Sequence, residues 1–321
     1  ALGLKKNDWL WTSPNSFVAS ANCGIYCGAK VDFVDIDPIS YNMSIDALEK
    51  KLFDAQKNNL LPKIIIPVHF AGQSCDMKRI YELSKIYGFK IVEDASHAIG
   101  GKFLDGSIGS CRFSDITVFS FHPVKIITTG EGGMALTNNT KLADKMMLLR
   151  THGITRDITK MSHNDGPWYY QQIDLGFNYR MTDIQAALGI TQSDRLESYV
   201  AKRNEIANFY HEALSALPIK TPEIQKNSYS SYHLYIIRLD LESISLSHRD
   251  VFMNLRESGI GVNLHYIPIH LHPYYQNLGF NKGDFPNAES YYSRAISIPM
   301  YQTLEFQMQD EVIDVLKRVL V

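Results

Sequence analysis

The first half of the chain alternates short apolar runs, rich in β-branched residues, with stretches of helical periodicity. Two runs, Ile64–Val68 and Ile116–Phe119, are apolar at nearly every position. Such runs are typical of strands buried on both faces, as in a parallel sheet covered by helices. Their spacing with the helical stretches forms βαβ units and predicts an α/β fold with a large, mostly parallel sheet. The expected strands are Asp8–Thr12, Val31–Asp35, Lys63–Phe70, Lys90–Asp94, Asp115–Phe121 and Gly133–Thr137, and the expected helices between them are Ser16–Gly28, Ile45–Lys57 and Met77–Tyr87.

The pattern changes in the second half of the chain. Helical periodicity covers Leu142–Arg150 and then a long stretch from Thr182 to about Leu214, whereas Leu217–Ser230 has the Pro, Asn and Ser content of a linker. Two domains are therefore expected: a large α/β domain over residues 1–190, and residues 191–321 as a long connecting helix with a small α+β domain. For the small domain the sequence predicts strands Tyr232–Leu241 and Gly261–Ile267 and helices Arg249–Ser258 and Phe306–Leu320.

Composition excludes several classes of protein. The 321 residues include 32 Lys and Arg against 34 Asp and Glu, so no basic excess points to nucleic acid as a partner. No apolar run approaches the ~18 residues that a membrane span needs. The four cysteines are irregularly spaced, and Cys23 and Cys27 have no second Cys/His pair at zinc spacing. We therefore expect no metal site and a reducing, cytoplasmic location.

Polar residues gather where three of the expected strands end, at Pro14–Phe17, Asp94–His97 and Ser120–Lys125. Ligands of open α/β sheets bind beyond the carboxyl ends of the strands, so these residues are candidates for a site. Asp94 follows a buried run into this edge, where a carboxylate needs a cation or several donors. The alternative is that Asp94 caps the turn that follows it.

Lys125 stands alone in an apolar stretch just past a buried strand. Burial would lower the pKa of its amine and make it a nucleophile for carbonyl groups; the alternative is a solvated surface lysine. Ser120, five residues earlier, offers a hydroxyl to an anion. A lysine amine, a carboxylate for a ring nitrogen and donors for a phosphate are the groups that pyridoxal phosphate (PLP) requires. The sequence therefore predicts a PLP site.

Four motifs at characteristic spacing make this prediction more specific: Glu93–Ala98, Ser120–Lys125, Gly130–Gly133 and Gly176–Met181. With them, nearly the whole chain resembles the DegT/DnrJ/EryC1/StrS family of sugar-nucleotide aminotransferases. The resemblance implies the PLP-dependent transferase fold of type I, the cofactor pyridoxal 5'-phosphate, and a homodimer with shared active sites. Neither nucleic acid nor a membrane is expected as a partner.

The resemblance also implies roles for the catalytic and cofactor-binding residues. Lys125 would bond to the cofactor aldehyde and later move the proton between the donor carbon and the cofactor, while Asp94 would pair with the ring nitrogen. The remaining cofactor contacts would be His97 at the ring's 3-hydroxyl, Ser120 at the phosphate, Phe17 stacked on the ring, and Asn178 at the phosphate of the neighbouring subunit. For Phe17 the alternative is an ordinary core residue.

Within the family, the chain most resembles the aminotransferases of pseudaminic acid biosynthesis, on segments such as Leu149–Ile154, His233–Tyr235 and Gly261–Pro268. These transfer an amino group from L-glutamate to C4 of a UDP-linked 4-keto-6-deoxy-N-acetylhexosamine, giving UDP-4-amino-4,6-dideoxy-N-acetyl-β-L-altrosamine. Arg180 would then bind the substrate diphosphate or the donor carboxylate, or fix the dimer loop. His265 and Tyr266 would lie near the nucleotide diphosphate, unless they are an ordinary pair at a strand end.

Other readings remain open at this point. In the first, the enzyme acts on another nucleotide 3- or 4-keto sugar. In the second, the chain is a non-catalytic relative that binds a sugar nucleotide. A nicotinamide-dependent enzyme is disfavoured because no Gly-x-Gly-x-x-Gly follows a strand. The family has a phosphate-binding segment ahead of the point where this sequence begins, so an N-terminal segment is expected to be missing.

Overall fold

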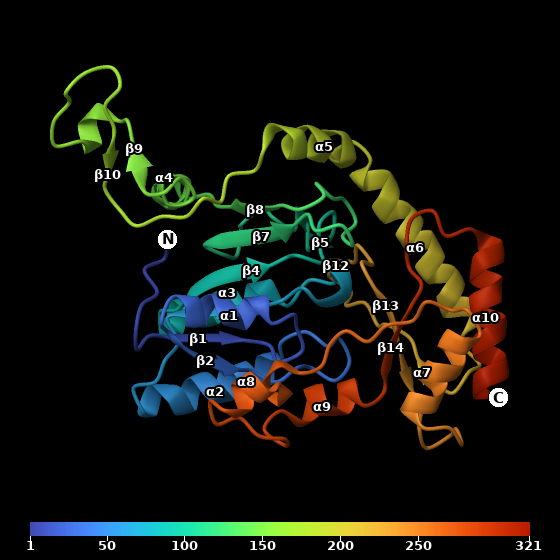
Figure 1. The fold of residues 1–321 in the computed structure, drawn as a ribbon. Coiled ribbons are helices and arrows are strands. Elements are labelled where there is room, and N and C mark those ends of the chain that lie inside the picture. The colour runs from blue at the N-terminus through green and yellow to red at the C-terminus, as the bar shows by residue number, and fades with distance from the viewer.

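The computed structural model describes all 321 residues, and a six-stranded sheet forms its centre (Figure 1). Neighbouring strands of this sheet run parallel except for the last pair, which is antiparallel. The predicted α/β fold with a mostly parallel sheet is therefore confirmed. In spatial order the strands are β2 (Lys30–Phe33), β1 (Trp9–Thr12), β3 (Ile64–Ile66), β4 (Lys90–Asp94), β7 (Ile116–Ser120) and β8 (Gly133–Leu136).

The inner strands of this sheet are buried on both faces, as the apolar runs predicted, whereas the edge strand β8 is largely exposed. Adjacent residues of one strand enter different cores: Leu10 packs on the side of α1 (Ala19–Tyr26), whereas Trp11 packs on the side of α2 (Ile45–Lys57) and α3 (Met77–Tyr87). Strand side chains alternate between the faces of a sheet, so a strand covered on both sides has to be apolar throughout. The same alternation decides which residues of β4 reach which face.

The C-terminal part has a core of its own. Its three-stranded antiparallel sheet has the order β11 (Ile219–Lys220), β13 (Tyr235–Leu239) and β14 (Ala295–Ile298). Three helices pack around it, α6 (Leu196–Ala213), α7 (His248–Glu257) and α10 (Phe306–Leu320). In Figure 1, α6 leads from the top of the large sheet to this smaller lobe, where α10 lies beside it.

The chain then returns from the smaller lobe to the large sheet. The segment with the 3-10 helix η3 (Ile269–Leu271), α8 (Pro273–Gln276) and α9 (Pro286–Tyr292) packs on the α1 face. Tyr275 and Tyr291 of this segment are buried in the same cluster as Leu10. One core thus takes residues from both sides of the predicted boundary, and the division into 1–190 and 191–321 stays a prediction.

The predicted strand Gly261–Ile267 is wrong, because only one bridge joins Asn263 to Ser297 of β14. Beyond Asn263 the chain leaves the small sheet for the large one. The Tyr266 N–H donates to the Asn15 side chain at 3.4 Å, and the Ile269 N–H donates to the Pro14 carbonyl at 2.8 Å. The strand β14 was not predicted, although its four residues are all buried.

The long predicted helix Thr182–Leu214 is two helices, α5 (Asp183–Ser193) and α6. A capping box formed by Thr182 and Gln185 starts α5. The chain bends at 194–195, where the Arg195 N–H bonds to the Gln192 carbonyl in i→i−3 geometry. None of the α5 side chains is fully buried, whereas α6 buries five of its side chains. The bend lets α6 pack on the smaller lobe while α5 lies over the large sheet (Figure 1).

Residues 150–180 form an arm that projects from the body of the molecule (Figure 1). It follows α4 (Thr140–Leu149) and contains the two-stranded sheet of β9 (Ile154–Thr155) and β10 (Gln171–Gln172). Two glycines let its base close. A Cβ on Gly153, whose φ is +70°, would meet the Asp174 carbonyl oxygen at 1.9 Å, and one on Gly176 would meet the Gly153 nitrogen at 2.3 Å.

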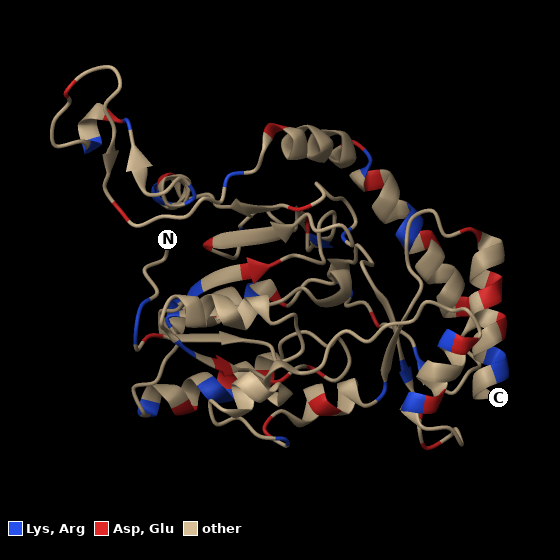
Figure 2. Ribbon diagram, viewed as in Figure 1, with Lys and Arg blue, Asp and Glu red and all other residues tan.

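The remaining elements are short. A third small sheet joins β12 (Ser228–Tyr229), β5 (Lys102–Phe103) and β6 (Gly106–Ser107), so part of the expected linker pairs with the large lobe. The other two 3-10 turns are η1 (Phe70–Gly72) and η2 (Ile158–Lys160). No helix has the length and apolar character to cross a membrane. Figure 2 shows Lys, Arg, Asp and Glu interspersed on most helices, whereas the middle of α5 carries no charge.

Arg203 of α6 holds its helix to the segments before β13 and after β14 through hydrogen bonds. It is 3% exposed and donates through Nη1 to the carbonyls of Tyr232, His233 and Met300, at 3.0, 3.3 and 3.0 Å. Its Nη2 donates to Gln302 at 3.1 Å. No carboxylate forms an ion pair with it, and burial lowers the pKa of its guanidinium to about 10. Arg203 therefore acts as a multiple donor to backbone rather than as a partner in an ion pair.

We predict that Arg203→Met lowers the free energy of unfolding by about 2–4 kcal/mol, because it leaves buried carbonyl groups without donors. The neighbouring Lys202, paired with Glu205 at 2.9 Å on the surface, provides the control. Lys202→Met should change stability by less than about 1 kcal/mol. Urea denaturation followed by circular dichroism measures both variants, and equal losses would contradict this role for Arg203.

Candidate active site

Asp94 lies at the carboxyl end of β4, on the face of the sheet that α1 covers. Its Oδ2 accepts a hydrogen bond from the Ser20 hydroxyl at 2.5 Å, and its Oδ1 accepts one from the Ser96 N–H at 3.0 Å. Asp94 therefore does cap the turn that follows it, as the alternative in the sequence analysis held. The bond from Ser20, on a helix 74 residues away in sequence, holds the carboxylate in place as well.

Lys125 follows the end of β7 in a tight turn. The Lys125 N–H donates to the His122 carbonyl at 2.9 Å, and Pro123 occupies the second position of this four-residue turn, where its fixed φ is favourable. The side chain is half-buried. Burial lowers the pKa of its amine, and the negative charge of Asp94 raises it in part. Lys125 is thus not an ordinary solvated lysine, and its charge interacts with that of Asp94.

His97 and Tyr266 meet where the large sheet adjoins the returning C-terminal segment. The Tyr266 hydroxyl lies 3.0 Å from His97 Nε2, and the two rings are stacked at 25° with their centroids 6.0 Å apart. The ring centroid of His233 lies 4.4 Å from that of His97. Burial, and then the neighbouring His233 and the positive charge of Lys125, lower the pKa of His97 well below its ordinary value, so the ring is neutral.

His265 and Phe17 complete the group around Lys125. His265 Nδ1 lies 2.8 Å from the Ser297 hydroxyl, and burial together with the charge of Lys125 lowers the pKa of His265 to about 4. Phe17 is 60% exposed, so it is not the core residue of the alternative interpretation. Its ring centroid lies 6.3 Å from that of Tyr266. His265 and Tyr266 are not a strand-end pair, because no strand forms there.

Ser120 is the last residue of β7 and is half-buried. Its hydroxyl accepts a hydrogen bond from the His122 N–H at 3.4 Å, and its own hydrogen has no acceptor within the chain. The hydroxyl is therefore available to an anion at the same sheet edge as Asp94.

Asn178 and Arg180 lie apart from this group. Both are exposed at the base of the arm, where Asn178 forms a bridge with Thr151 and the Tyr179 N–H donates to the Arg150 carbonyl. No hydrogen bond or ion pair links either side chain to Asp94, Lys125 or His97. Within one chain, the structure does not bring these two predicted residues to the candidate site.

Behind Asp94, on the opposite face of β4, lies a buried polar network centred on Glu93. Glu93 lies 2.7 Å from His69 Nε2 and accepts hydrogen bonds from the Ser114 and Thr117 hydroxyls. His69 Nδ1 accepts the Cys75 N–H at 3.2 Å, so its ring donates through Nε2 to the carboxylate. Burial alone would raise the pKa of Glu93, but these donors lower it. The His69 N–H also donates to the Asp94 carbonyl at 3.0 Å, which ties the network to the site.

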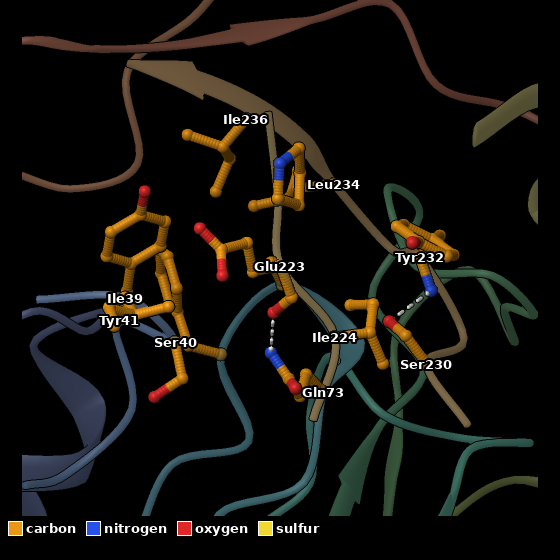
Figure 3. Close-up of a pocket in the computed structure, with 13 residues that line it drawn as sticks. Ile39, Ser40, Tyr41, Gln73, Glu223, Ile224, Ser230, Tyr232, Leu234 and Ile236 are labelled. Carbon is orange, nitrogen blue, oxygen red and sulfur yellow. Dashed lines mark hydrogen bonds between the residues drawn. The ribbon is translucent and has the colours of Figure 1, made fainter. Parts of the chain in front are cut away.

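A small cavity lies between the η1 loop and the segment 222–236 (Figure 3), and Phe70 is one of the residues that line it. Its volume is about 20 Å³, room for one water molecule, so it is not a ligand site. Gln73 binds the segment 222–236 with two hydrogen bonds. Its Nε2 donates to the Glu223 carbonyl at 3.1 Å, and its Oε1 accepts a bond from the Gln225 N–H at 2.6 Å.

Sequence reasoning missed two residues of the site. Ser20 lies within an ordinary helical stretch, and nothing in the sequence indicates that its hydroxyl reaches Asp94. His233 was noted as part of the segment His233–Tyr235 but was given no role. Only the packing of the segment after 230 against the end of β4 brings its ring beside His97.

These residues fit PLP. The edge offers a half-buried amine, a fixed carboxylate and a free hydroxyl, which suit an aldehyde, a protonated ring nitrogen and a phosphate. In addition, His97 Nδ1 is buried without a hydrogen-bond partner, and such an atom needs a polar ligand. Fold and site together define a PLP-dependent transferase of fold type I.

The family model described as the DegT/DnrJ/EryC1/StrS aminotransferase family matches residues 1–317, and the chain belongs to this family. An uncharacterized protein of Methanocaldococcus jannaschii is 40% identical over 321 residues, 99% of this chain and 80% of that protein. The UDP-4-amino-4,6-dideoxy-N-acetyl-beta-L-altrosamine transaminase of Campylobacter jejuni is 36% identical over 324 residues, 99% and 82% of the two chains. The GDP-perosamine synthase of Caulobacter vibrioides is 34% identical over 326 residues, 100% and 81%.

Solved structures agree with this assignment. PseC of Helicobacter pylori, an aminotransferase involved in the biosynthesis of pseudoaminic acid, is 29% identical with a TM-score of 0.88, over 98% of this chain and 80% of that one. A Streptococcus pneumoniae protein in its PLP form is 29% identical with a TM-score of 0.85, over 100% and 83%. The chain is therefore a PLP-dependent sugar aminotransferase.

We predict that Asp94→Asn lowers the pKa of Lys125 further, because it removes the negative charge that raises it. Without cofactor, the acetylation of Lys125, followed by mass spectrometry, should then reach its half-maximal rate at a lower pH than in the wild type. Asp115→Asn is the control, since Asp115 pairs with Lys90 on the surface at 3.0 Å. A Lys125 profile that Asp94→Asn leaves unchanged would show that the two charges do not interact.

Proposed function

We propose that this enzyme transfers the amino group of L-glutamate to C4 of a UDP-linked 4-keto-6-deoxy-N-acetylhexosamine. The product would be UDP-4-amino-4,6-dideoxy-N-acetyl-β-L-altrosamine, an amino sugar for pseudaminic acid biosynthesis. The chemistry rests on one observation, the placement of the half-buried Lys125 and the fixed Asp94 carboxylate together at the carboxyl edge of the sheet. The choice of sugar rests on similarity to the Campylobacter jejuni transaminase and to PseC.

Bound PLP supplies an aldehyde that condenses with amines and a protonated ring that stabilises negative charge on the adjacent carbon. Lys125 would hold the aldehyde at rest. Once the amino donor has displaced it, its free amine would accept the proton from the donor's α-carbon and later return a proton at C4 of the sugar. The lowered pKa of Lys125 suits a base, because it increases the fraction of amine without a proton.

Asp94 would keep the ring nitrogen protonated, since a carboxylate beside it favours the charged form. The bonds from Ser20 and from the Ser96 N–H fix this carboxylate without neutralising it, because both are neutral donors. Ser20 is thus proposed as a positioning residue. Glu93 and His69 support the same strand end from the other face.

The other residues would bind rather than react. We propose that Phe17 stacks on the cofactor ring, that Ser120 binds its phosphate and that His97 contacts its 3-oxygen. His265 and Tyr266 would face the sugar nucleotide. The exposure of Phe17 and the free hydrogen of Ser120 support these roles.

We also propose a homodimer in which Asn178 and Arg180 complete the site of the partner subunit. The exposed apolar side chains on the arm and on α5 support it, since a monomer rarely exposes large apolar patches. Leu175 is 81% exposed and Ile184 is 85% exposed. A cytoplasmic location is proposed because all four cysteines are free thiols, which a reducing compartment preserves.

A different sugar nucleotide is the second candidate substrate. The similarity to GDP-perosamine synthase, 34% over the whole chain, favours it and is close to the similarity to the altrosamine transaminase. The discriminating experiment incubates the enzyme with PLP, L-glutamate and either a UDP-linked or a GDP-linked 4-keto-6-deoxy sugar. Mass spectrometry of the products identifies the sugar that is aminated. If neither 2-oxoglutarate nor an amino sugar forms, the non-catalytic alternative applies.

We predict that Lys125→Ala lowers the turnover number by a factor of about 10³ or more, because it removes both the covalent attachment and the base. The absorbance of the lysine-bound cofactor should also be lost. Lys90→Ala is the control, as Lys90 lies at the opposite end of β4 and is exposed. Retention of turnover by Lys125→Ala would rule out the proposed mechanism.

We predict that Ile184→Asp converts the dimer to a monomer, because it places a charge in the apolar surface of α5. Sedimentation velocity measures the change. Ile86→Asp is a matched control, since Ile86 is also exposed, at 66%, but lies on α3. A wild-type chain that sediments as a monomer would contradict the proposed homodimer.

A further inference from the structure

Tyr266 is held where the returning C-terminal segment meets the large sheet. Its N–H donates to Asn15 and its ring lies 6.3 Å from those of both Phe17 and Phe70, while its hydroxyl lies 3.0 Å from His97 Nε2. That hydroxyl has no other partner in the chain. The geometry therefore pairs one phenol hydroxyl with one imidazole nitrogen.

Counting hydrogens decides which of the two atoms donates. A neutral imidazole carries one hydrogen, on either Nδ1 or Nε2. If Nε2 donated, the Tyr266 hydroxyl hydrogen and the Nδ1 lone pair would both lack partners. If Tyr266 donates instead, only one group, the Nδ1–H of His97, remains without a partner. Burial lowers the pKa of His97 and raises the pKa of Tyr266, which favours a neutral ring and a protonated phenol.

The Nδ1 atom of His97 is buried and has no partner, and the whole residue is 6% exposed. The nearby His233 ring does not satisfy it, because His233 Nδ1 is without a partner as well. A buried N–H donor without an acceptor costs about 1–3 kcal/mol, so the site favours a ligand that brings an acceptor. An anionic oxygen gains the most from such a donor.

We propose that Tyr266 is a positioning residue that acts through His97: its hydroxyl donates to Nε2, fixes the ring hydrogen on Nδ1, and thereby prepares a donor for the 3-oxygen of the PLP ring. The proposal rests on the proposed cofactor site. It assigns to Tyr266 a task that is separate from contact with the sugar nucleotide.

The first test needs no cofactor. Long-range ¹H–¹⁵N spectra of the protein labelled in its histidines report which ring nitrogen carries the hydrogen, and His97→Gln identifies the signal of His97. The expected wild-type result is hydrogen on Nδ1. In Tyr266→Phe, His97 should shift toward the Nε2–H form that a free imidazole ring prefers. Hydrogen on Nε2 in the wild type, or an unchanged tautomer in Tyr266→Phe, overturns the proposal.

The control is Tyr210→Phe, which removes a phenol hydroxyl that donates to the Pro299 carbonyl at 3.1 Å, in the core of the smaller lobe. It should leave the His97 tautomer unchanged. A shift of the same size in Tyr210→Phe would mean that the tautomer responds to general loosening of the fold, which also overturns the proposal.

The second test measures PLP affinity by absorbance titration. Tyr266→Phe should weaken binding about tenfold or more, the usual effect of losing a hydrogen bond to a charged group. In the His97→Gln background the same substitution should have little effect, because an amide always carries donor hydrogens. Equal losses in both backgrounds overturn the role through His97. If the tautomer is as expected but the wild type does not bind PLP, the proposed function fails instead.

Discussion

The edge of the sheet at which Lys125 and Asp94 lie has to keep charged groups partly out of water, and the surrounding structure is arranged around that requirement. The Lys125 amine loses hydration, which lowers its pKa, and the Asp94 charge offsets part of that loss. Asp94 in turn receives only neutral donors, so its charge remains available to a cationic ring. Three histidines close to Lys125 stay neutral, because burial first, and then the positive charge of Lys125, lower their pKa values.

The strand β4 serves this edge with both of its faces. Glu93 and Asp94 are adjacent, so their side chains point to opposite sides of the sheet. Glu93 is buried with a full set of donors and joins the strand to the η1 loop and to β7. Asp94 keeps capacity for a ligand. The Glu93 face of the strand thus holds β4 in place, and the Asp94 face carries the carboxylate that is free to bind a ligand.

The sequence was sufficient for whatever depends on the order of residues along the chain. Runs such as Ile64–Val68 predicted a parallel sheet, and the polar ends of the runs marked the edge at which Asp94, His97 and Lys125 lie. It was insufficient where partners are far apart. The Ser20–Asp94 bond joins residues 74 positions apart. The segment 261–267 has the apolar content of a strand, but its N–H groups bond to Asn15 and β14 rather than to one ladder. Such pairing is decided by tertiary packing.

The same segment limits how the molecule can move. The chain passes between the lobes at α6, again near His233, again between Asn263 and Ile269, and again after α9, and Arg203 bonds to the backbone at His233. A single connection between two lobes allows them to rotate, whereas several connections resist rotation and shear. Access to the site is therefore a matter for loops and side chains at its rim, and the two lobes are expected to behave as one mechanical body during turnover.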